Sequence, residues 1–393
     1  MSIYPGLPRY INEKHYDALY DCSDGATMFF WKNASKNMML AYTAQLEELG
    51  FTKHQELENP CICSASYCKE QFSIHVYYLK KTAELRAIAQ NNAILPTNPA
   101  EYKKLCDIAV TQLGLYFDPK VYTSMGYLIR LEDGTFVVID GGKGFDYNAE
   151  LLYNTMLEQK PDGIDDIVIS AWIVTHGHGD HCGVFCKFAT NYADKVTVKM
   201  LVGNDAPDLV YQSCLDGFVR HFNFAATSER FEGCVYMKAH TGQQFHLPGI
   251  TLTVLYTHED IFPDMMHNYN DTSLVVDAVV KGKVTKKAVR KGVTRFVFLA
   301  DLHPDGAQCL IDMYGKHMKC DVMQIAHHGI GCYHTDLYML CNPKIAYWPC
   351  GKEVLEYKNG SRFQRPHIKY LVDTTEQMIY QPDGNHTFVF ENK

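Results

Sequence analysis

The stretch Thr175-His176-Gly177-His178-Gly179-Asp180-His181 carries the strongest structural signal in this chain, because it places four metal-ligand side chains within six residues. It follows residues 167–174, an apolar run typical of a buried strand. Alternating side chains of an extended segment project to the same side, so the first two histidines can bind one metal ion. The aspartate and histidine at the turn into the next helix can reach a second ion. A histidine-rich surface loop is the plain alternative, but the spacing after a buried strand argues against it.

The composition is that of an ordinary globular protein, with 47% hydrophobic and 21% charged residues in 393. The formal net charge of −8 does not favour non-specific binding to nucleic acid or to anionic membranes. No apolar stretch is long enough for a transmembrane helix, and the first residues lack the basic and apolar regions of a signal peptide. We therefore predict a cytoplasmic protein without membrane association, whose 14 cysteines are mostly reduced thiols.

Two regions differ in their predicted elements. In residues 1–118 the pattern predicts a helix over 33–50 and a small sheet that it covers, followed by a loop or linker at 95–99. Strands of this sheet are expected at 51–55, 61–66, 72–79 and 85–89.

From about residue 121 strands and helices alternate. Glu132-Asp133-Gly134 is a strong hairpin turn between strands at 127–131 and 136–139. Further strands are expected at 167–174, 252–256, 274–280, 295–299, 322–325, 345–348, 378–380 and 387–390, and helices at 149–157, 182–192, 207–219, 305–317 and 335–341. Two sheets with helices outside is the simplest packing of this order.

His-x-His-x-Asp-His after an apolar strand resembles the signature of the metallo-β-lactamase superfamily. The resemblance extends over about residues 120–393: the hairpin at 127–142 ends in Asp-Gly, the strand at 296–301 ends in Asp301, and the segment 321–329 ends in His-His-Gly. It implies an α/β fold, an αββα four-layer sandwich, as a catalytic domain over 119–393. Residues 1–118 are then a small α+β accessory region of unknown role.

Within the superfamily, the segments 270–275, 365–367 and 380–384 resemble the metallo-β-lactamase domain of the DNA-uptake competence proteins, without their membrane channel. Many superfamily members supply one more histidine to the first ion from the region that corresponds to 257–273. Here His258 and His267 are available, but an ordinary loop histidine is the better default for each. A vacant position would be filled by water or substrate, or would leave the first ion weakly held.

The resemblance also implies roles for the site residues, with two divalent ions as cofactors. Zinc suits the mixed imidazole and carboxylate ligands, with manganese or iron as alternatives. We expect His176 and His178 on the first ion, Asp180 and His181 on the second, and Asp301 as the bridge. One histidine of the pair that follows completes the second site; we favour His327 as this ligand, which leaves His328, with Asp180, for a catalytic role. His334 and Asn270 are expected to contact the substrate.

Two such ions activate water for hydrolysis, and the competence-like resemblance favours a phosphoester or phosphodiester substrate. Hydrolysis of a lactone, thioester or β-lactam is the alternative, and a vestigial metal-binding scaffold that binds a partner is the non-enzymatic one. Nucleic acid is a possible but not a favoured substrate, and the oligomeric state stays open. The basic run 281–291 is expected to be a solvated loop; were it to fold over the active-site mouth, it would favour an anionic substrate.

Overall fold

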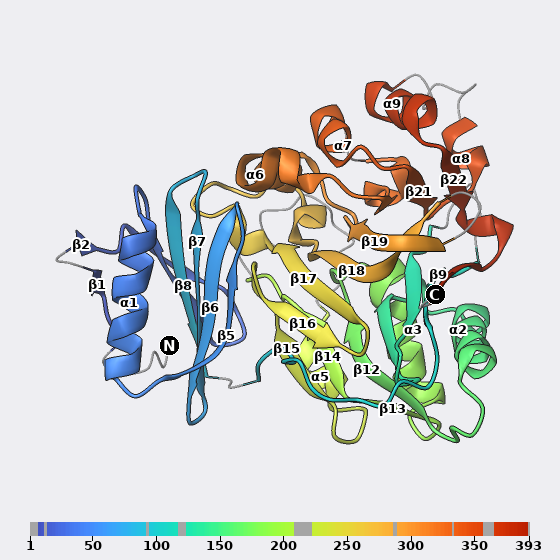
Figure 1. Ribbon diagram of the computed structural model, residues 1–393, viewed down its shortest axis with the longest axis horizontal. Helices are drawn as coiled ribbons and strands as arrows, with labels where there is room; N and C mark the ends of the chain where they lie inside the picture. The colour runs from blue at the N-terminus through green and yellow to red at the C-terminus, as the bar shows by residue number, and fades with distance from the viewer. Residues whose placement is uncertain are drawn as a thin grey trace.

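The computed structural model describes residues 7–11, 14–91, 94–116, 123–207, 222–285, 289–331, 334–356 and 365–391. Its C-terminal three-quarters form two sheets packed face to face, with helices on both outer faces (Figure 1). The helix expected over 207–219 falls almost entirely outside the described residues. The predicted αββα sandwich is confirmed.

The first central sheet has the strand order β15-β14-β12-β11-β10-β9-β23, with β13 paired to β12. Its centre is a hairpin of β10 and β11 followed by parallel β12, and the predicted turn joins the hairpin strands. The strand bounds are β9 (Ile108–Gln112), β10 (Gly126–Arg130), β11 (Phe136–Asp140), β12 (Ile167–Ile173), β13 (Val196–Val198), β14 (Met200–Gly203), β15 (Val235–Lys238) and β23 (His386–Phe390).

The second central sheet runs β16-β17-β18-β19-β20-β21-β22. Its first four strands are antiparallel, and β19 to β22 are parallel. The bounds are β16 (Gln244–Leu247), β17 (Ile250–Tyr256), β18 (Val275–Val284), β19 (Val289–Phe298), β20 (Val322–Gln324), β21 (Ile345–Trp348) and β22 (Gln377–Tyr380). Apolar side chains of both sheets, such as Ile139 and Phe298, form one core between them.

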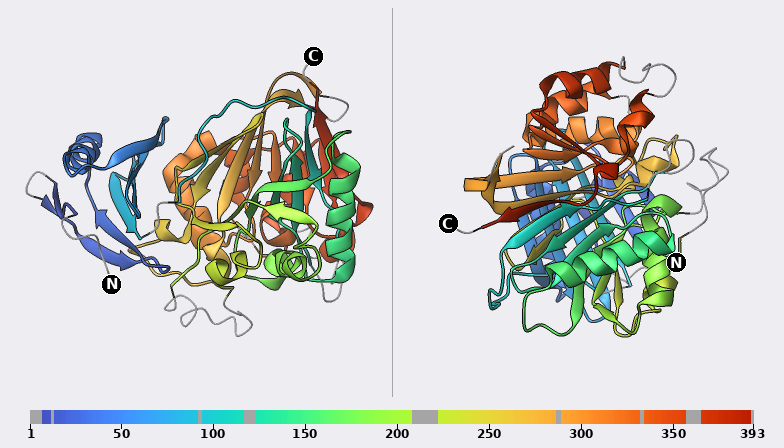
Figure 2. Two further views of the ribbon diagram at one scale, coloured as in Figure 1. Left: turned by 90° about the horizontal axis from the view of Figure 1, so that it is seen from below. Right: turned by 90° about the vertical axis from the view of Figure 1, so that its right-hand side faces the viewer.

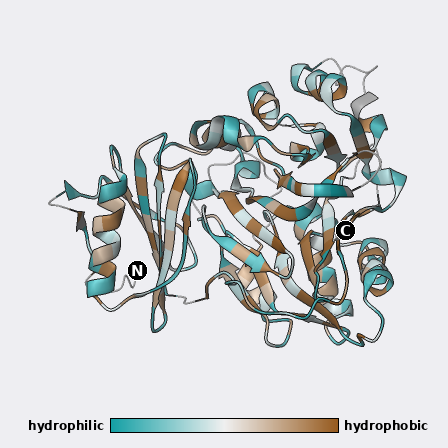
Figure 3. Ribbon diagram, viewed as in Figure 1, coloured by the Kyte–Doolittle hydropathy of each residue, from teal (hydrophilic) through white to brown (hydrophobic). Residues whose placement is uncertain are grey.

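Each outer sheet face is covered by its own helices (Figure 2, right). The first sheet packs on α2 (Asp146–Gln159), α3 (Gly179–Asn191) and the short α5 (Phe224–Ser228) through residues such as Trp172 and Phe188. The second packs on α6 (Pro304–Tyr314), α7 (Thr335–Cys341) and α9 (Pro366–Thr374), with α8 (Lys352–Glu356) nearby in the chain. Hydrophobic residues therefore concentrate on the central strands and the inner helix faces (Figure 3).

The N-terminal region is a six-stranded antiparallel sheet, β3-β4-β8-β7-β6-β5, covered on one face by α1 (Lys36–Glu48). Ser35 caps this helix by accepting a hydrogen bond from the Met38 N–H. The strands are β3 (Ala18–Asp21), β4 (Ala26–Trp31), β5 (Thr52–Glu58), β6 (Ile62–Lys69), β7 (Phe72–Leu79) and β8 (Glu84–Gln90), preceded by the small pair β1 (Tyr10–Ile11) and β2 (Lys14–His15). The other face shares a core with the C-terminal region, where Tyr77 and Ile88 lie in one cluster with Tyr256.

The chain between the two regions crosses over as irregular structure at 94–107, where a loop or linker was predicted. β9 then joins the first central sheet, so this sheet begins before the predicted boundary at residue 119. Among the described helices, none is long and apolar enough to cross a membrane. The cytoplasmic location stays a prediction.

The described residues of the basic run, 281–285 and 289–291, lie at one end of the β18–β19 hairpin. The metal-site segments lie at the other end of these strands, because Ser273 precedes β18 and Asp301 follows β19. Each strand has 10 residues, which at about 3.3 Å per residue gives roughly 33 Å between the two ends. Residues 281–284 and 289–291 are strand rather than the expected loop, and at six or more residues from the start of β18 they lie about 20–30 Å from the predicted metal site.

Candidate metal centre

The histidine motif lies where β12 ends and α3 begins, with His178 as the residue that caps the helix. Gly177 is required here by close packing: a Cβ at this position would lie 2.6 Å from the Tyr269 hydroxyl oxygen. The Tyr269 ring in turn lies 5.0 Å from the His178 ring, centroid to centroid. The motif is therefore held between α3 and the segment that contains Tyr269.

Asp140, at the end of β11, fixes the histidine motif through hydrogen bonds. Its fully buried carboxylate accepts hydrogen bonds from the Thr175 N–H at 2.8 Å, the Thr175 hydroxyl at 3.0 Å and His181 Nδ1 at 2.8 Å. The backbone of Asp140 is left-handed, with φ 60°. The sequence-based site did not include this residue, although the Asp-Gly-Gly that ends the strand was the signal for it.

Asp301 reaches the site from the loop after β19. The residue before it, Ala300, is left-handed with φ 50°, and its N–H and carbonyl both bond the Gln324 side chain, at 2.6 and 2.9 Å. The Asp301 N–H donates to the Ser273 hydroxyl at 3.1 Å. Strained backbone held by neighbouring groups is typical of functional sites, and here it turns the carboxylate toward the histidines.

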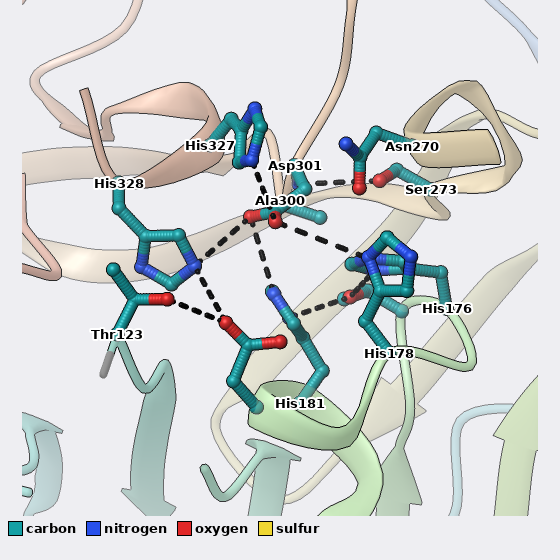
Figure 4. Close-up of polar contacts among 12 residues, drawn as sticks. Thr123, His176, His178, His181, Asn270, Ser273, Ala300, Asp301, His327 and His328 are labelled. Atoms are coloured by element: carbon teal, nitrogen blue, oxygen red, sulfur yellow. Dashed lines mark hydrogen bonds and ion pairs between the residues drawn. The ribbon is translucent and has the colours of Figure 1, made fainter. Parts of the chain in front are cut away.

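These segments bring the predicted ligands together (Figure 4). Asp301 Oδ1 lies 3.2 Å from His181 Nε2 and 3.5 Å from His328 Nε2, and Asp301 Oδ2 lies 3.9 Å from His176 Nε2. Asp180 Oδ2 lies 3.4 Å from His328 Nε2. Two overlapping groups have all their ligand atoms within 4.8 Å of one another: His176, His181 and Asp301, and Asp180, His181 and His328.

Three buried atoms at the centre have no hydrogen-bond partner among the described residues: His181 Nε2, His328 Nε2 and Asp301 Oδ1. The Nδ1 atoms of both histidines are already used, His181 toward Asp140 and His328 toward the Pro349 carbonyl at 2.8 Å. Oxygen acceptors at Nδ1 leave the Nε2 lone pair available, which is the usual arrangement of metal-ligating histidines. Imidazole and carboxylate donors with unpaired atoms that face one point fit divalent metal ions.

The structure places His327 and His328 differently from the sequence-based choice, which favoured His327 as the ligand. Both residues have left-handed backbones, with φ 46° and 53°, so their side chains diverge. His328 is buried against Asp180 and Asp301, whereas the His327 side chain is 23% exposed and its Nε2 lies 3.8 Å from Asp301 Oδ2. The His327 Nδ1 is paired with His303 Nε2 at 2.7 Å. The placement favours His328 for the second site.

Charges within the cluster set the protonation of its members. Burial disfavours charge on His328, but attraction to the carboxylates of Asp301 and Asp180 outweighs this and raises its pKa to about 9. The pKa of His181 is likewise raised well above its usual value, because Asp301 and Asp140 outweigh burial. Burial lowers the pKa of His327 to about 4. Without metal, protons therefore occupy the two inward-facing histidines.

The remaining predicted residues lie in different surroundings. Asn270 is buried beside Ser273 and Asp301 (Figure 4). His334 caps α7 and is partly exposed, and among the described residues it makes no hydrogen bond or ion pair with the cluster. His258 Nε2 is 2.9 Å from Asn204 Oδ1, and the exposed His267 pairs with Asp305. Neither belongs to the two ligand groups.

Thr123 is a further site residue that the sequence did not reveal. Its hydroxyl donates to Asp180 Oδ2 at 2.6 Å and orients that carboxylate (Figure 4). A lone threonine before a strand has no recognisable signal, because its role depends on the return of the chain to β10 beside α3.

Residues 120–201, which contain the histidine motif, match the family model of the metallo-beta-lactamase superfamily. The match covers this segment of the chain, so it is these residues that are similar to the superfamily. No curated protein matches the sequence.

Among solved structures, the metallo-beta-lactamase fold protein YhfI from Bacillus subtilis is similar at 12% identity and a TM-score of 0.41, over 72% of this chain and 99% of YhfI. Unliganded PDE1 from yeast is 11% identical with a TM-score of 0.41, over 73% of this chain and 100% of PDE1. The diiron beta-hydroxylase CmlA from Streptomyces venezuelae is 10% identical with a TM-score of 0.38, over 75% of this chain and 55% of CmlA. Likeness at this level says nothing about the activity of this protein.

Proposed function

We propose that the protein is a metal-dependent hydrolase with a dinuclear centre that acts on a phosphoester or phosphodiester. The observation that carries the proposal is the convergence of His181, His328 and Asp301: Asp301 Oδ1 lies 3.2 and 3.5 Å from the two Nε2 atoms, and none of these three buried atoms has a hydrogen-bond partner in the described part of the chain. Unpaired buried polar atoms are costly unless a ligand satisfies them. A vestigial scaffold has no reason to retain such a set, so we favour an enzyme.

Each side chain has a distinct role in this proposal. Asp180, His181 and His328 would hold the second ion, His176 and His178 the first, and Asp301 both. Bound divalent ions lower the pKa of water toward neutrality and polarise an ester oxygen. Asp140 and Thr123 fix the orientation of their partners, His181 and Asp180, through hydrogen bonds.

His327 is placed to contact the substrate rather than a metal ion. It is the partly exposed member of the pair, and His303 Nε2, which lies 2.7 Å from His327 Nδ1, fixes the orientation of its ring. An imidazole at the rim of the centre can donate a hydrogen bond or a proton to a leaving oxygen. This assignment exchanges the roles of His327 and His328 relative to the sequence-based prediction.

The bond class rests on the resemblance of residues 270–275 and 321–329 to the competence proteins. The distance of the basic 281–291 hairpin from the centre and the net charge of −8 favour a small phosphoester over long nucleic acid. Hydrolysis of a lactone, thioester or β-lactam remains the second candidate, because the same donor set activates water for attack on a carbonyl.

A substrate panel tests the proposal. The zinc-loaded and manganese-loaded protein is assayed with chromogenic phosphodiester, phosphomonoester, lactone, thioester and β-lactam substrates, with Asp301→Asn as the matched inactive control. We expect hydrolysis of a phosphoester that Asp301→Asn abolishes. Hydrolysis of only a lactone, thioester or β-lactam would reject the bond class, and equal rates for both proteins would reject the site.

A further inference from the structure

The His176 side of the centre has fewer protein ligands than the His181 side. Among the described residues, the ligand-type side chains near His176 are His178, whose Nδ1 lies 3.0 Å from His176 Nε2, Asp301 and His181, and we assign His181 to the other ion. His258 bonds Asn204 through Nε2, and its Nδ1 is buried without a partner in the described part of the chain, while His267 pairs with Asp305; neither belongs to the two ligand groups. With His176, His178 and Asp301 as its ligands, a four-coordinate zinc ion has one position for a further donor.

Asn270 presents an unpaired oxygen at this place. The residue lies in the short helical turn η2 (Tyr269–Thr272) and is 4% exposed. Its side-chain Oδ1 is buried without a hydrogen-bond partner in the described part of the chain. Figure 4 shows the side chain beside Ser273 and Asp301, on the side of His176 and His178, with the amide oxygen directed toward the cluster.

The turn that carries Asn270 is fixed by the same segments that carry the ligands. The Asn270 carbonyl accepts from the Ser273 N–H at 3.0 Å, and the Ser273 hydroxyl accepts from the Asp301 N–H at 3.1 Å. The Leu274 N–H donates to the Thr175 carbonyl at 2.8 Å, directly before the histidine motif. The backbone turn that carries the Asn270 amide is thus held in position before any metal ion binds.

We propose that the Asn270 side-chain oxygen is a ligand of the ion held by His176 and His178, an inference that rests on the dinuclear centre proposed above. An amide oxygen is a neutral ligand that zinc, manganese and iron accept in mixed sites. Binding a cation also removes the unfavourable burial of an unpaired acceptor. The sequence analysis assigned Asn270 to the substrate, and the two roles make different predictions for metal binding.

The test uses the metal-free full chain titrated with Zn²⁺ by calorimetry, together with thermal unfolding with and without zinc. The variants are Asn270→Ala and Asn270→Asp, with His258→Ala as the control from the same segment. We expect two zinc sites in the wild type. Asn270→Ala should weaken one of them roughly tenfold or more and leave the other unchanged, whereas Asn270→Asp and His258→Ala keep both.

Metal-free Asn270→Ala should unfold at a temperature no lower than the wild type, because it loses an unpaired buried acceptor. Two zinc sites of wild-type affinity in Asn270→Ala would overturn the ligand role, whatever happens to KM. Loss of a site in both Asn270 variants, or in His258→Ala alone, would overturn it as well. A wild type that binds none of zinc, manganese and iron would instead reject the proposed function itself.

Discussion

Asp140 determines which nitrogen of His181 faces the metal centre, and Asp140→Asn tests this directly. The buried carboxylate accepts from the Thr175 N–H, the Thr175 hydroxyl and His181 Nδ1, at 2.8, 3.0 and 2.8 Å. Because a carboxylate only accepts, it keeps the His181 proton on Nδ1 and leaves the Nε2 lone pair for a cation. Asparagine has the same shape but replaces one acceptor with a donor.

Either orientation of the introduced side-chain amide is unfavourable in Asp140→Asn. With its NH₂ toward His181, Nδ1 must accept and the proton moves to Nε2, which can then no longer bind metal. With its NH₂ toward Thr175, two N–H donors oppose each other. Loss of a buried bond to a charged group costs about 1.5–3 kcal/mol, and removal of such a partner of a metal-ligating histidine lowers metal affinity roughly 10–100-fold.

The assay is the dissociation constant of zinc, measured by competition with a chromogenic chelator, with circular dichroism to confirm folding. Asp146→Asn is the matched control, since the Asp146 side chain is 80% exposed and pairs with Lys187 at the surface. We expect wild-type affinity in the control and a loss of roughly 10–100-fold in Asp140→Asn. Wild-type zinc affinity in a folded Asp140→Asn protein would refute the tautomer argument.

Three further predictions concern pH, substrate contact and charge. The pKa of His328 is raised from 6.5 to about 9, so its protonation stabilises the metal-free fold fully below pH 6.5. The free energy of unfolding, measured by urea titration, should therefore fall as the pH rises toward 9. Zinc affinity should rise over the same pH range, because zinc binds the deprotonated imidazole. A Cβ at Gly331 would lie 1.7 Å from His327 Nδ1, so Gly331→Ala should displace the His327 ring. We expect a lower kcat with unchanged zinc content. Loss of zinc would contradict the assignment of His327 to the substrate. Neutralising Lys281 and Lys291 should leave KM for an anionic phosphodiester unchanged at any salt concentration, and a higher KM would place the hairpin near the substrate.

The sequence predicted the elements whose periodicity or length is pronounced. The strands at 72–79 and 345–348 have the predicted bounds, and the helix over 33–50 is found as α1 (Lys36–Glu48). The all-buried β4 (Ala26–Trp31) was missed, although it is a short apolar run of the kind that predicted the buried strand at 167–174. Short strands such as β14 (Met200–Gly203) depend on pairing with neighbours rather than on their own pattern.

The site could be predicted where chemistry and spacing coincide in one segment, as in residues 176–181. The orientation of adjacent residues could not. His327 and His328 are equivalent in the sequence, and their left-handed backbones decide which one turns inward. Asp140 and Thr123 act through contacts across the fold, 41 residues before His181 and 57 before Asp180. Such pairings exist only after α3 has packed against the first central sheet.

The most direct test of the central claim is the zinc content of the purified full chain and of Asp301→Asn, measured by mass spectrometry of the elements after reconstitution and removal of excess metal. Two zinc ions per wild-type chain are expected, with loss of zinc in Asp301→Asn, because Asp301 faces both ligand groups. A wild type without bound zinc, manganese or iron would contradict the account, as would two tightly bound ions in Asp301→Asn.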